Sequence, residues 1–159
     1  NHSDKSWVTN QYDQSVMCDT VLKSGSDAAI IRIHNKDKAI AVSVDSSADY
    51  CKSYPISGGK QIVCENWRNL ISVGAKPLAI TNCLNFGNPE KKEIMGEFAE
   101  CLEGIKEACE FLDYPVVSGN VSFYNGTNNK NIFPTPVIGG VGLINNLSKP
   151  LTLNLKKRK

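Results

Sequence analysis

The stretch that decides the fold spans residues 77–117 and reads PLAITNCLNFGNPEKKEIMGEFAECLEGIKEACEFLDYPVV. It opens and closes with short apolar runs, at 77–81 and 114–117, that are typical of β-strands. Between them, apolar side chains recur every three or four residues from 90 to 112, with Glu and Lys between them, which predicts an amphipathic helix. The stretch therefore predicts two strands joined by a helical crossover.

The pattern extends outward from this stretch in both directions. Upstream, two β-type runs flank a polar segment and predict a hairpin, and a second helical pattern begins at Gly58 and ends before Gly74. We expect strands at 28–33, 39–44, 77–81, 114–117 and 136–144, helices at 58–73 and 90–112, and irregular chain at 45–57, 82–89 and 125–131. The order β-β-α-β-α-β-β predicts an α+β fold, a mixed β-sheet with helices on one face.

Three regions are predicted along the chain. Residues 1–26 are a polar lead-in segment with weak periodicity, in which one short helical turn is expected around 13–17. Residues 27–147 form the folded domain. Residues 148–159 include an alternating run that looks like the first strand of a truncated C-terminal domain, so we expect the chain to be a domain of a longer protein.

Composition and charge exclude several classes of function. The 159 residues are 41% hydrophobic and 21% charged, which is typical of a soluble globular protein. Lys and Arg number 18 against 16 Asp and Glu, which gives no electrostatic basis for a nucleic-acid or membrane partner. No apolar run approaches the roughly 18 residues that span a bilayer. The six cysteines include no CxxC pair, so we expect reduced thiols and a cytoplasmic protein.

Two segments place small and amide residues directly after predicted strands, where ligands gather in α/β layers. One runs from 81 to 90 and the other from 118 to 122. Gly119 allows close backbone approach, Asn120 offers a carbonyl oxygen for a hard cation, and Ser122 offers a hydroxyl. The alternative is that both segments are ordinary Asn- and Gly-rich turns.

A third set of candidate residues involves the first predicted helix. Glu65 and Asn69 lie four residues apart, so their oxygen atoms share one helix face. With Asp27 they form an oxygen-ligand set suited to Mg²⁺. The alternative is an exposed polar face on which Glu65 pairs with Arg68 or Lys60.

Two segments also carry a family resemblance. The words ITNCLNFGNPE, at 80–90, and VVSGNVSFYN, at 116–125, strongly resemble the synthetase subunit of phosphoribosylformylglycinamidine synthase, of the small type. That family is built from two repeats, each beginning with a domain similar to the N-terminal domain of aminoimidazole ribonucleotide synthetase. The chain resembles that N-terminal domain in the second repeat.

The resemblance implies a ligase of de novo purine biosynthesis. Such an enzyme uses ATP, Mg²⁺ and glutamine-derived ammonia to convert formylglycinamide ribonucleotide to formylglycinamidine ribonucleotide. The implied partners are the first repeat of the same parent chain, a glutaminase subunit and a small bridging subunit. A free-standing, non-catalytic nucleotide-binding domain with a structural or regulatory role remains the alternative.

Site roles transfer by resemblance, position by position. Asn82 and Gly119 match ATP contacts, Asn120 a Mg²⁺ ligand and Ser122 a substrate contact. Asn82 replaces an aspartate of the family, so any role there that needs a carboxylate is lost. Asp27, Glu65 and Asn69 match the Mg²⁺ positions of a non-catalytic nucleotide site in the large, single-chain form.

No catalytic residue is assigned to this chain. The catalytic histidine of the family belongs to an H-N-H-P motif in the first repeat, and the corresponding stretch here, 45–50, contains no histidine. Residues 47–49 also depart from the N-P-R that relatives carry. We therefore expect the chain alone to be inactive, and its strands at 28–33, 39–44 and 136–144 to leave an apolar surface that supports a homodimer.

Overall fold

The computed structural model describes residues 4, 6–12, 15–23, 25–147 and 151–152. Its main element is a six-stranded sheet of order β1-β2-β3-β8-β4-β5, in which only the β4–β5 pair is parallel. The strands are β1 (Thr20–Leu22), β2 (Ala29–Arg32), β3 (Ala39–Ser46), β4 (Lys76–Asn85), β5 (Val116–Ser122), β6 (Gly126–Thr127), β7 (Lys130–Asn131) and β8 (Thr135–Ile144). The helices are α1 (Ser6–Thr9), the 3₁₀ turn η1 (Val16–Cys18), α2 (Ala48–Ser53), α3 (Pro55–Ser72) and α4 (Lys92–Leu112).

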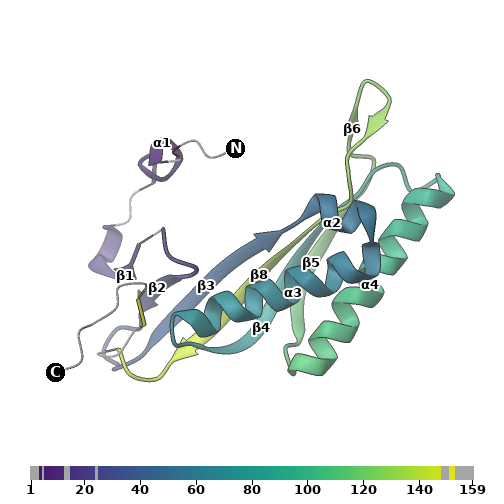
Figure 1. Ribbon diagram of the computed structural model, residues 1–159. Helices are drawn as coiled ribbons and strands as arrows, with labels where there is room; N and C mark the ends of the chain where they lie inside the picture. Colours follow the sequence, from purple (N-terminus) through teal and green to yellow (C-terminus); the bar gives the residue numbers. More distant parts are fainter. Residues whose placement is uncertain (1–3, 5, 13–14, 24, 148–150, 153–159) are drawn as a thin grey trace.

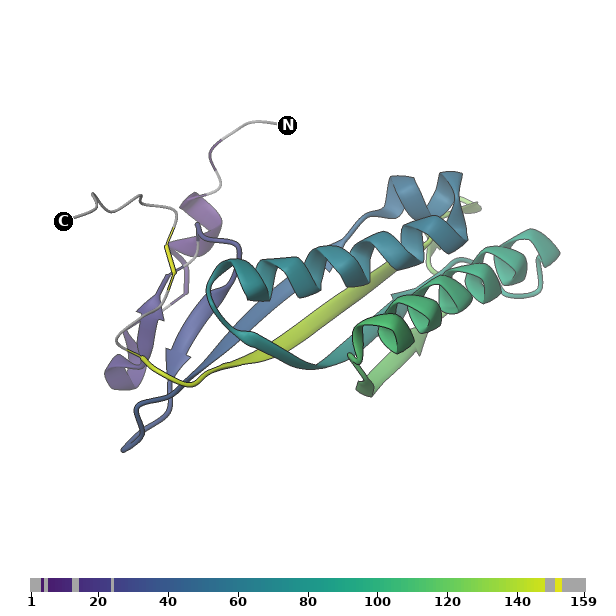
Figure 2. The ribbon, with the colours of Figure 1, turned by 60° about the horizontal axis from the view of Figure 1, so that its bottom comes forward.

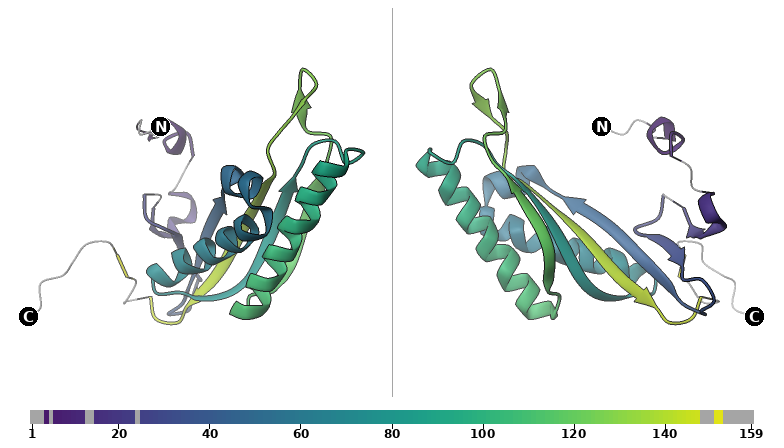
Figure 3. Two further views of the ribbon diagram at one scale, coloured as in Figure 1. Left: turned by 45° about the vertical axis from the view of Figure 1, so that its right-hand side comes forward. Right: turned by 180° about the vertical axis from the view of Figure 1, so that it is seen from behind.

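The two long helices cover one face of the sheet. Figures 1 and 2 show α3 and α4 running side by side over the same face, with the short α2 at one end of α3. Seen from behind, the strands lie in front of α3, α4 lies alongside β5, and no described helix crosses that opposite face (Figure 3). The predicted α+β fold, a mixed sheet with helices on one face, is confirmed.

Glycines let the helices approach backbone to backbone. A Cβ atom built on Gly59 of α3 would lie 2.4 Å from the carbonyl oxygen of Cys101 in α4. One built on Gly104 of α4 would lie 2.0 Å from the carbonyl oxygen of Ile56. Real Cβ atoms do not approach other atoms so closely, so a side chain at either position would push the helices apart. This helix pair is therefore specified by the absence of side chains as much as by apolar contact.

The open face of the sheet is apolar over β2, β3 and β8. In β3, Ala39 and Ala41 are buried under the helices, whereas Ile40 and Val44 point the other way and are 37% and 67% exposed. The neighbouring strands continue this surface, because Ile31 pairs with Ile40 and Val141 pairs with Val42. An apolar strip therefore crosses β2, β3 and β8 on the face without helices.

A buried polar network joins the sheet to α3. Asn66 is fully buried, and its Nδ2 donates to the carbonyl oxygens of Ser43 (3.1 Å) and Ile138 (3.3 Å) and to Asp45 Oδ2 (2.8 Å). Its Oδ1 accepts a 2.8 Å hydrogen bond from the hydroxyl of Tyr114. One amide thus connects β3, β8, α3 and the residue that leads into β5.

Space for this network comes from a glycine in β8. A Cβ built on Gly140 would lie 1.9 Å from Asn66 Oδ1 and 2.1 Å from the Tyr114 hydroxyl. Burial raises the pKa of Tyr114 well above its usual range, with smaller contributions from the nearby Asp45 and Cys109. The Tyr114 hydroxyl therefore stays protonated and remains a hydrogen-bond donor at neutral pH.

The structure corrects several predicted boundaries before α3. The segment 45–57, expected to be irregular, contains α2 and the beginning of α3, which starts at Pro55 rather than at Gly58. Proline fits the first turn of a helix because the N–H it lacks has no partner there. The lead-in contains β1, and of the helical turn expected at 13–17, residues 13–14 lie outside the described residues while 16–18 form η1.

Three segments expected to be loops contain strand. β4 runs through Asn85 and β5 through Ser122, because both lie beside partner strands that override the low strand propensity of Asn and Gly. The segment 125–131 contains the hairpin β6–β7, which projects from the body of the molecule in Figure 1. Its turn residues, Asn128 and Asn129, have φ of 51° and 60°, as a two-residue hairpin turn requires.

We expect Tyr114→Phe to lower the free energy of unfolding by about 1–3 kcal/mol, because it leaves Asn66 Oδ1 buried without a donor. Urea denaturation at pH 7 measures this loss. The matched control is Tyr54→Phe, since Tyr54 is 73% exposed and should change stability by less than ~0.5 kcal/mol. Equal losses in the two variants would contradict the role of the network.

The same variant tests the raised pKa of Tyr114. In the unfolded chain a tyrosine loses its proton at about pH 10, whereas the folded chain keeps it to higher pH. The unfolded state therefore gains stability as pH rises above about 10, and the free energy of unfolding falls. Denaturation at pH 9–11 should show a smaller fall for Tyr114→Phe than for the parent chain.

Candidate functional site

The parallel pairing of β4 with β5 brings the predicted ATP, metal and substrate residues together. Asn82 is in register with Gly119, Cys83 with Asn120, and Asn85 with Ser122. The two amide-rich segments were expected to be loops after strands, but they are adjacent strands. Their backbones are therefore fixed by the sheet, and the four candidate residues occupy a short ladder at its edge.

The side chain of Asn82 lies over Gly119. A Cβ built on Gly119 would lie 2.0 Å from Asn82 Oδ1 and 2.8 Å from the Asn82 carbonyl oxygen. This close approach of Asn82 requires a glycine at 119. From the sequence, the same glycine is expected to allow close approach to the backbone at a ligand site. The amide of Asn82 is consequently held across the backbone of the edge strand.

Asn120 faces the other way, toward the open side of the sheet. Side chains alternate along a strand, so Asn120 shares a face with Ser118, whose hydroxyl donates to Thr81 Oγ1 at 2.8 Å. Asn120 is exposed, and its side chain has no hydrogen-bond partner among the described residues. Its amide oxygen is therefore available to a ligand.

An aromatic cluster anchors the ends of these two strands to α4. Phe86 follows β4, Phe123 follows β5, and both contact Phe98 of α4 edge-on, with ring centroids 5.1 Å and 5.2 Å away. The Phe86 N–H also donates to the carbonyl oxygen of Ser122 at 2.9 Å, which extends the parallel pairing by one step. Ser122 is thus placed by packing beneath it and by the ladder beside it.

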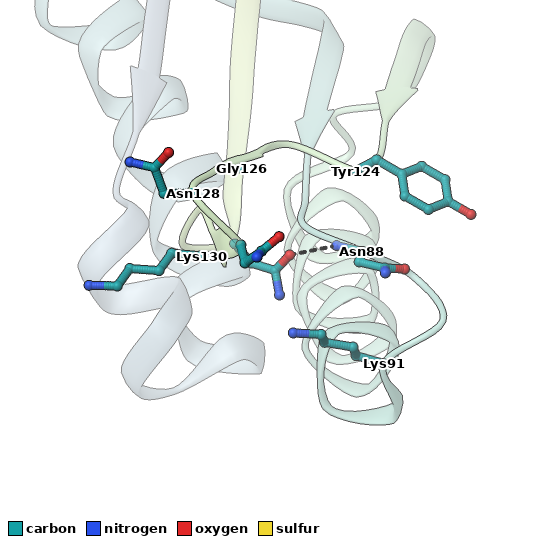
Figure 4. A pocket seen from close by; sticks show the side chains of 8 residues that line it. Asn88, Lys91, Tyr124, Gly126, Asn128 and Lys130 are labelled. Atoms are coloured by element: carbon teal, nitrogen blue, oxygen red, sulfur yellow. Dashed lines mark hydrogen bonds between the residues drawn. The ribbon is translucent and has the colours of Figure 1, made fainter.

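A polar depression of about 460 Å³ lies next to this region, at the base of the β6–β7 hairpin (Figure 4). Its lining includes two lysines and four asparagines, namely Lys91, Lys130, Asn88, Asn128, Asn129 and Asn131, and no carboxylate among the described residues. The Asn88 N–H donates to Asn131 Oδ1 at 3.0 Å, and this hydrogen bond joins the segment before α4 to strand β7. Sequence reasoning missed this feature, although the Asn128-Asn129 pair is a hairpin signal that could have indicated it.

The residues predicted for a second Mg²⁺ set lie on α3 (Glu65 and Asn69) and just before β2 (Asp27). Asp27 and Glu65 are exposed, and Asn69 Nδ2 donates to Asp45 Oδ1 at 2.7 Å. Within the described residues, no group of three or more His, Cys, Asp or Glu could hold a metal ion. Lys60, suggested as a partner of Glu65, instead forms an ion pair with Glu107 of α4.

Two buried cysteines have thiols whose pKa is raised by their surroundings. Burial raises the pKa of the Cys109 thiol to about 11, and a hydrogen bond with Cys51, followed by burial, raises that of Cys101 still further. These thiols stay protonated and unreactive at neutral pH. In the stretch 45–50, the carboxylate of Asp45 accepts hydrogen bonds from the side chains of Asn66, Asn69 and Ser43.

In the part of the chain that the structure describes, no helix is long and apolar enough to cross a membrane. The longest helix, α4, has an exposed face that carries several glutamates.

We expect Gly119→Ala to lower the free energy of unfolding by roughly 1–3 kcal/mol, because the new methyl group must displace Asn82. Gly96→Ala is the matched control: Gly96 lies in α4 with nothing within 4 Å of a built Cβ, so alanine should stabilise the helix by up to ~1 kcal/mol. Urea denaturation of both variants gives the comparison. Gly119→Ala with an unchanged midpoint would show that the close approach imposes no constraint.

Comparison with known proteins identifies the family to which this fold belongs. Over residues 25–144 the chain matches the family described as AIR synthase related protein, N-terminal domain. It is 62% identical, over 153 residues, to phosphoribosylformylglycinamidine synthase subunit PurL of Pelagibacter ubique, covering 96% of this chain and 21% of that protein. The chain therefore spans about a fifth of the length of this curated relative.

Solved structures with the same fold come from Thermotoga maritima. The structure of PurLQS matches with a TM-score of 0.89 and 37% identity, covering 97% of this chain and 26% of that one. PurL complexed with ATP matches with a TM-score of 0.80 and 38% identity over 91% and 24% of the two chains. PurL complexed with FGAR gives 0.79 and 39% over 90% and 23%. By fold, sequence and matched length, this chain belongs to the family of AIR synthase related proteins, as their N-terminal domain.

Proposed function

We propose that this chain is the N-terminal domain of the second repeat of a small-type PurL synthetase subunit, and that it contributes ATP, Mg²⁺ and substrate contacts to an active site completed elsewhere. The observation that carries this proposal is the parallel pairing of β4 with β5, which places Asn82, Gly119, Asn120 and Ser122 on one short ladder. The likeness to PurL structures complexed with ATP and with FGAR supports it.

The nucleotide contact rests on the Asn82–Gly119 pair. Without a side chain at 119, a nucleotide can approach the backbone of the edge strand, whose outer N–H and C=O groups have no neighbouring strand among the described residues. Asn82 keeps an amide oxygen and gains an N–H₂ donor relative to the aspartate of the family pattern. We therefore infer that this position binds ATP by hydrogen bonds and not by charge.

The side chain of Asn120 is suited to be one of several ligands of a Mg²⁺ ion. Its amide oxygen is a hard donor, it is exposed, and no described residue occupies it. The described residues include no group of three or more His, Cys, Asp or Glu that could hold a metal ion, so the remaining ligands would come from nucleotide phosphates, water or other domains. When bound, the ion neutralises charge on the phosphates. The role of Asp27, Glu65 and Asn69 at a second, non-catalytic nucleotide site stays a prediction.

Ser122 is the proposed contact to formylglycinamide ribonucleotide. It ends β5, and it is only partly buried. A hydroxyl at this position can donate to a phosphate, carbonyl or ribose oxygen. The ligase reaction, with glutamine-derived ammonia as nitrogen source, would then be assembled around it by the rest of the enzyme.

The proposed partners follow from the missing parts of the site. The chain contains no catalytic histidine at 45–50, so the first repeat of the same parent chain must supply it. A glutaminase subunit and a small bridging subunit would deliver ammonia, consistent with the likeness to PurLQS. We place this assembly in the cytoplasm, with no role for nucleic acid or membrane.

The experiment that tests the proposal is Asn120→Ala in the full-length synthetase subunit. Losing a ligand of an ion that stabilises charge in the transition state should lower kcat on the order of 10²-fold or more, with folding intact. Turnover is measured with formylglycinamide ribonucleotide, ATP and ammonium. Thr127→Ala, on the exposed hairpin, is the control. Wild-type turnover by Asn120→Ala would refute the metal assignment.

The second prediction of this proposal concerns the open apolar face. Without the first repeat, the strip formed by Ile31, Ile40, Val44 and Val141 faces water. A two-fold contact with a second copy would cover it, because such contacts are self-complementary. We expect the 159-residue chain to form a homodimer without ligase activity.

Light scattering at micromolar concentration tests for the homodimer, and Val44→Lys should shift the equilibrium toward monomer. A 17.4 kDa monomer throughout would contradict it.

A further inference from the structure

The polar depression at the base of the β6–β7 hairpin contains two asparagines whose amide oxygens are already used. Asn131 Oδ1 accepts a 3.0 Å hydrogen bond from the Asn88 N–H, and Asn88 Oδ1 accepts one of 2.9 Å from the Glu90 N–H. A backbone N–H can only donate, so these contacts fix the orientation of both amides. What each side chain has left for another partner is its Nδ2, which is a donor.

A glycine holds Asn131 against the segment that follows β4. A Cβ built on Gly87 would lie 2.5 Å from Asn131 Cβ and 2.8 Å from Asn131 Oδ1. Gly87 is buried, and its carbonyl oxygen accepts a 2.9 Å hydrogen bond from the Tyr124 N–H. The wall of the depression is therefore formed by three segments in close contact, those after β4, after β5 and in β7.

A lysine completes a set of donors at this wall. In the view of Figure 4, the Lys91 side chain passes below the hydrogen bond between Asn88 and Asn131, whereas Lys130 points away from it. Within the described residues, Lys91 forms no ion pair, and neither Nδ2 donates a hydrogen bond. We call Asn88, Lys91 and Asn131 the donor set. Every unused polar side-chain group in it is a donor.

Three donors with no carboxylate among the described lining residues are suited to an anion rich in acceptors. A phosphate ester carries three terminal oxygens and close to two negative charges at neutral pH, which gives one charged oxygen for each donor. The volume of about 460 Å³ lies within the roughly 300–1,000 Å³ of small-molecule pockets. The depression therefore has room for the group that carries the phosphate.

We propose that this depression binds the phosphate group of a small phosphate ester, held by the Lys91 ammonium and by Nδ2 of Asn88 and of Asn131. The observation that carries the proposal is that backbone N–H groups occupy both amide oxygens and leave only donors. This phosphate site is independent of the roles proposed for the four residues on the β4–β5 ladder.

Lysine acylation tests the phosphate site without any need for turnover. The full-length synthetase subunit is treated at neutral pH with a limiting amount of an amine-acylating reagent, and mass spectrometry gives the modification of each lysine. Saturating ribose 5-phosphate should lower the acylation of Lys91 by roughly fivefold or more, because a bound anion covers the amine. Ribose should give no protection, and Lys36, an exposed lysine of the 34–38 loop, should be unaffected.

Two further ligands distinguish the possible sources of the phosphate. Inorganic phosphate probes the group alone, and AMP probes a nucleotide. Stronger protection by AMP than by ribose 5-phosphate would identify a nucleotide as the ligand class, and the reverse order would identify a sugar phosphate.

Aspartate variants test the donor set itself. Asn88→Asp and Asn131→Asp each keep an acceptor for the backbone N–H but replace the Nδ2 donor with a charged oxygen. The protection factor, compared with and without ligand in the same variant, should fall below about twofold. Asn145→Asp makes the same chemical change at an exposed residue after β8 and should keep full protection. Full protection in both variants of the donor set would overturn the proposal, and either variant suffices if the other does not fold.

Two other results would also overturn the phosphate site. Equal protection of Lys36 and Lys91 would show a general ionic effect. Protection by acetate as strong as that by phosphate would show a site for any anion, such as an acidic side chain of a partner. Because acylation does not depend on turnover, either result would leave the proposed ligase function in place.

Discussion

The parallel pairing of β4 with β5 depends on the 21-residue helix α4, which carries the chain back so that both strands run in the same direction. This crossover determines which residues become neighbours, because parallel strands align their carboxyl ends. Phe98 of α4 packs on Phe86 and Phe123, the residues that follow the two strands. The same helix that enforces the pairing thus also supports the end of the ladder at which Ser122 lies.

Sequence patterns predicted the fold class and the long elements, because their apolar periodicity is strong and local. They failed where a partner strand decides conformation: Asn82, Asn85 and Asn120 have low strand propensity, yet the sheet makes them strand. The candidate residues themselves came from a family resemblance, and spacing alone left them as turns. The hydrogen bond from Asn125 Nδ2 to the carbonyl oxygen of Phe86 could not be predicted, since it joins residues 39 positions apart.

Polar groups in this domain do two separate tasks. The Asn66 network lies under the helices, is fully paired, and fixes how β3, β8 and α3 meet around Gly140. The ladder at the sheet edge is only partly paired, and Asn120 has no partner among the described residues. Buried amides that are satisfied specify structure, whereas exposed amides held on a rigid strand are available to ligands.

The contact between Asn82 and Gly119 constrains the two positions unequally in evolution. A lineage can exchange the asparagine for another short polar residue while the glycine stays. Shortening residue 82 does not by itself admit a side chain at 119, because a Cβ there would still lie 2.8 Å from the carbonyl oxygen of residue 82. Position 119 can diverge only if the backbones of β4 and β5 also move apart, so the edge strand should keep its glycine while the side chain opposite it varies.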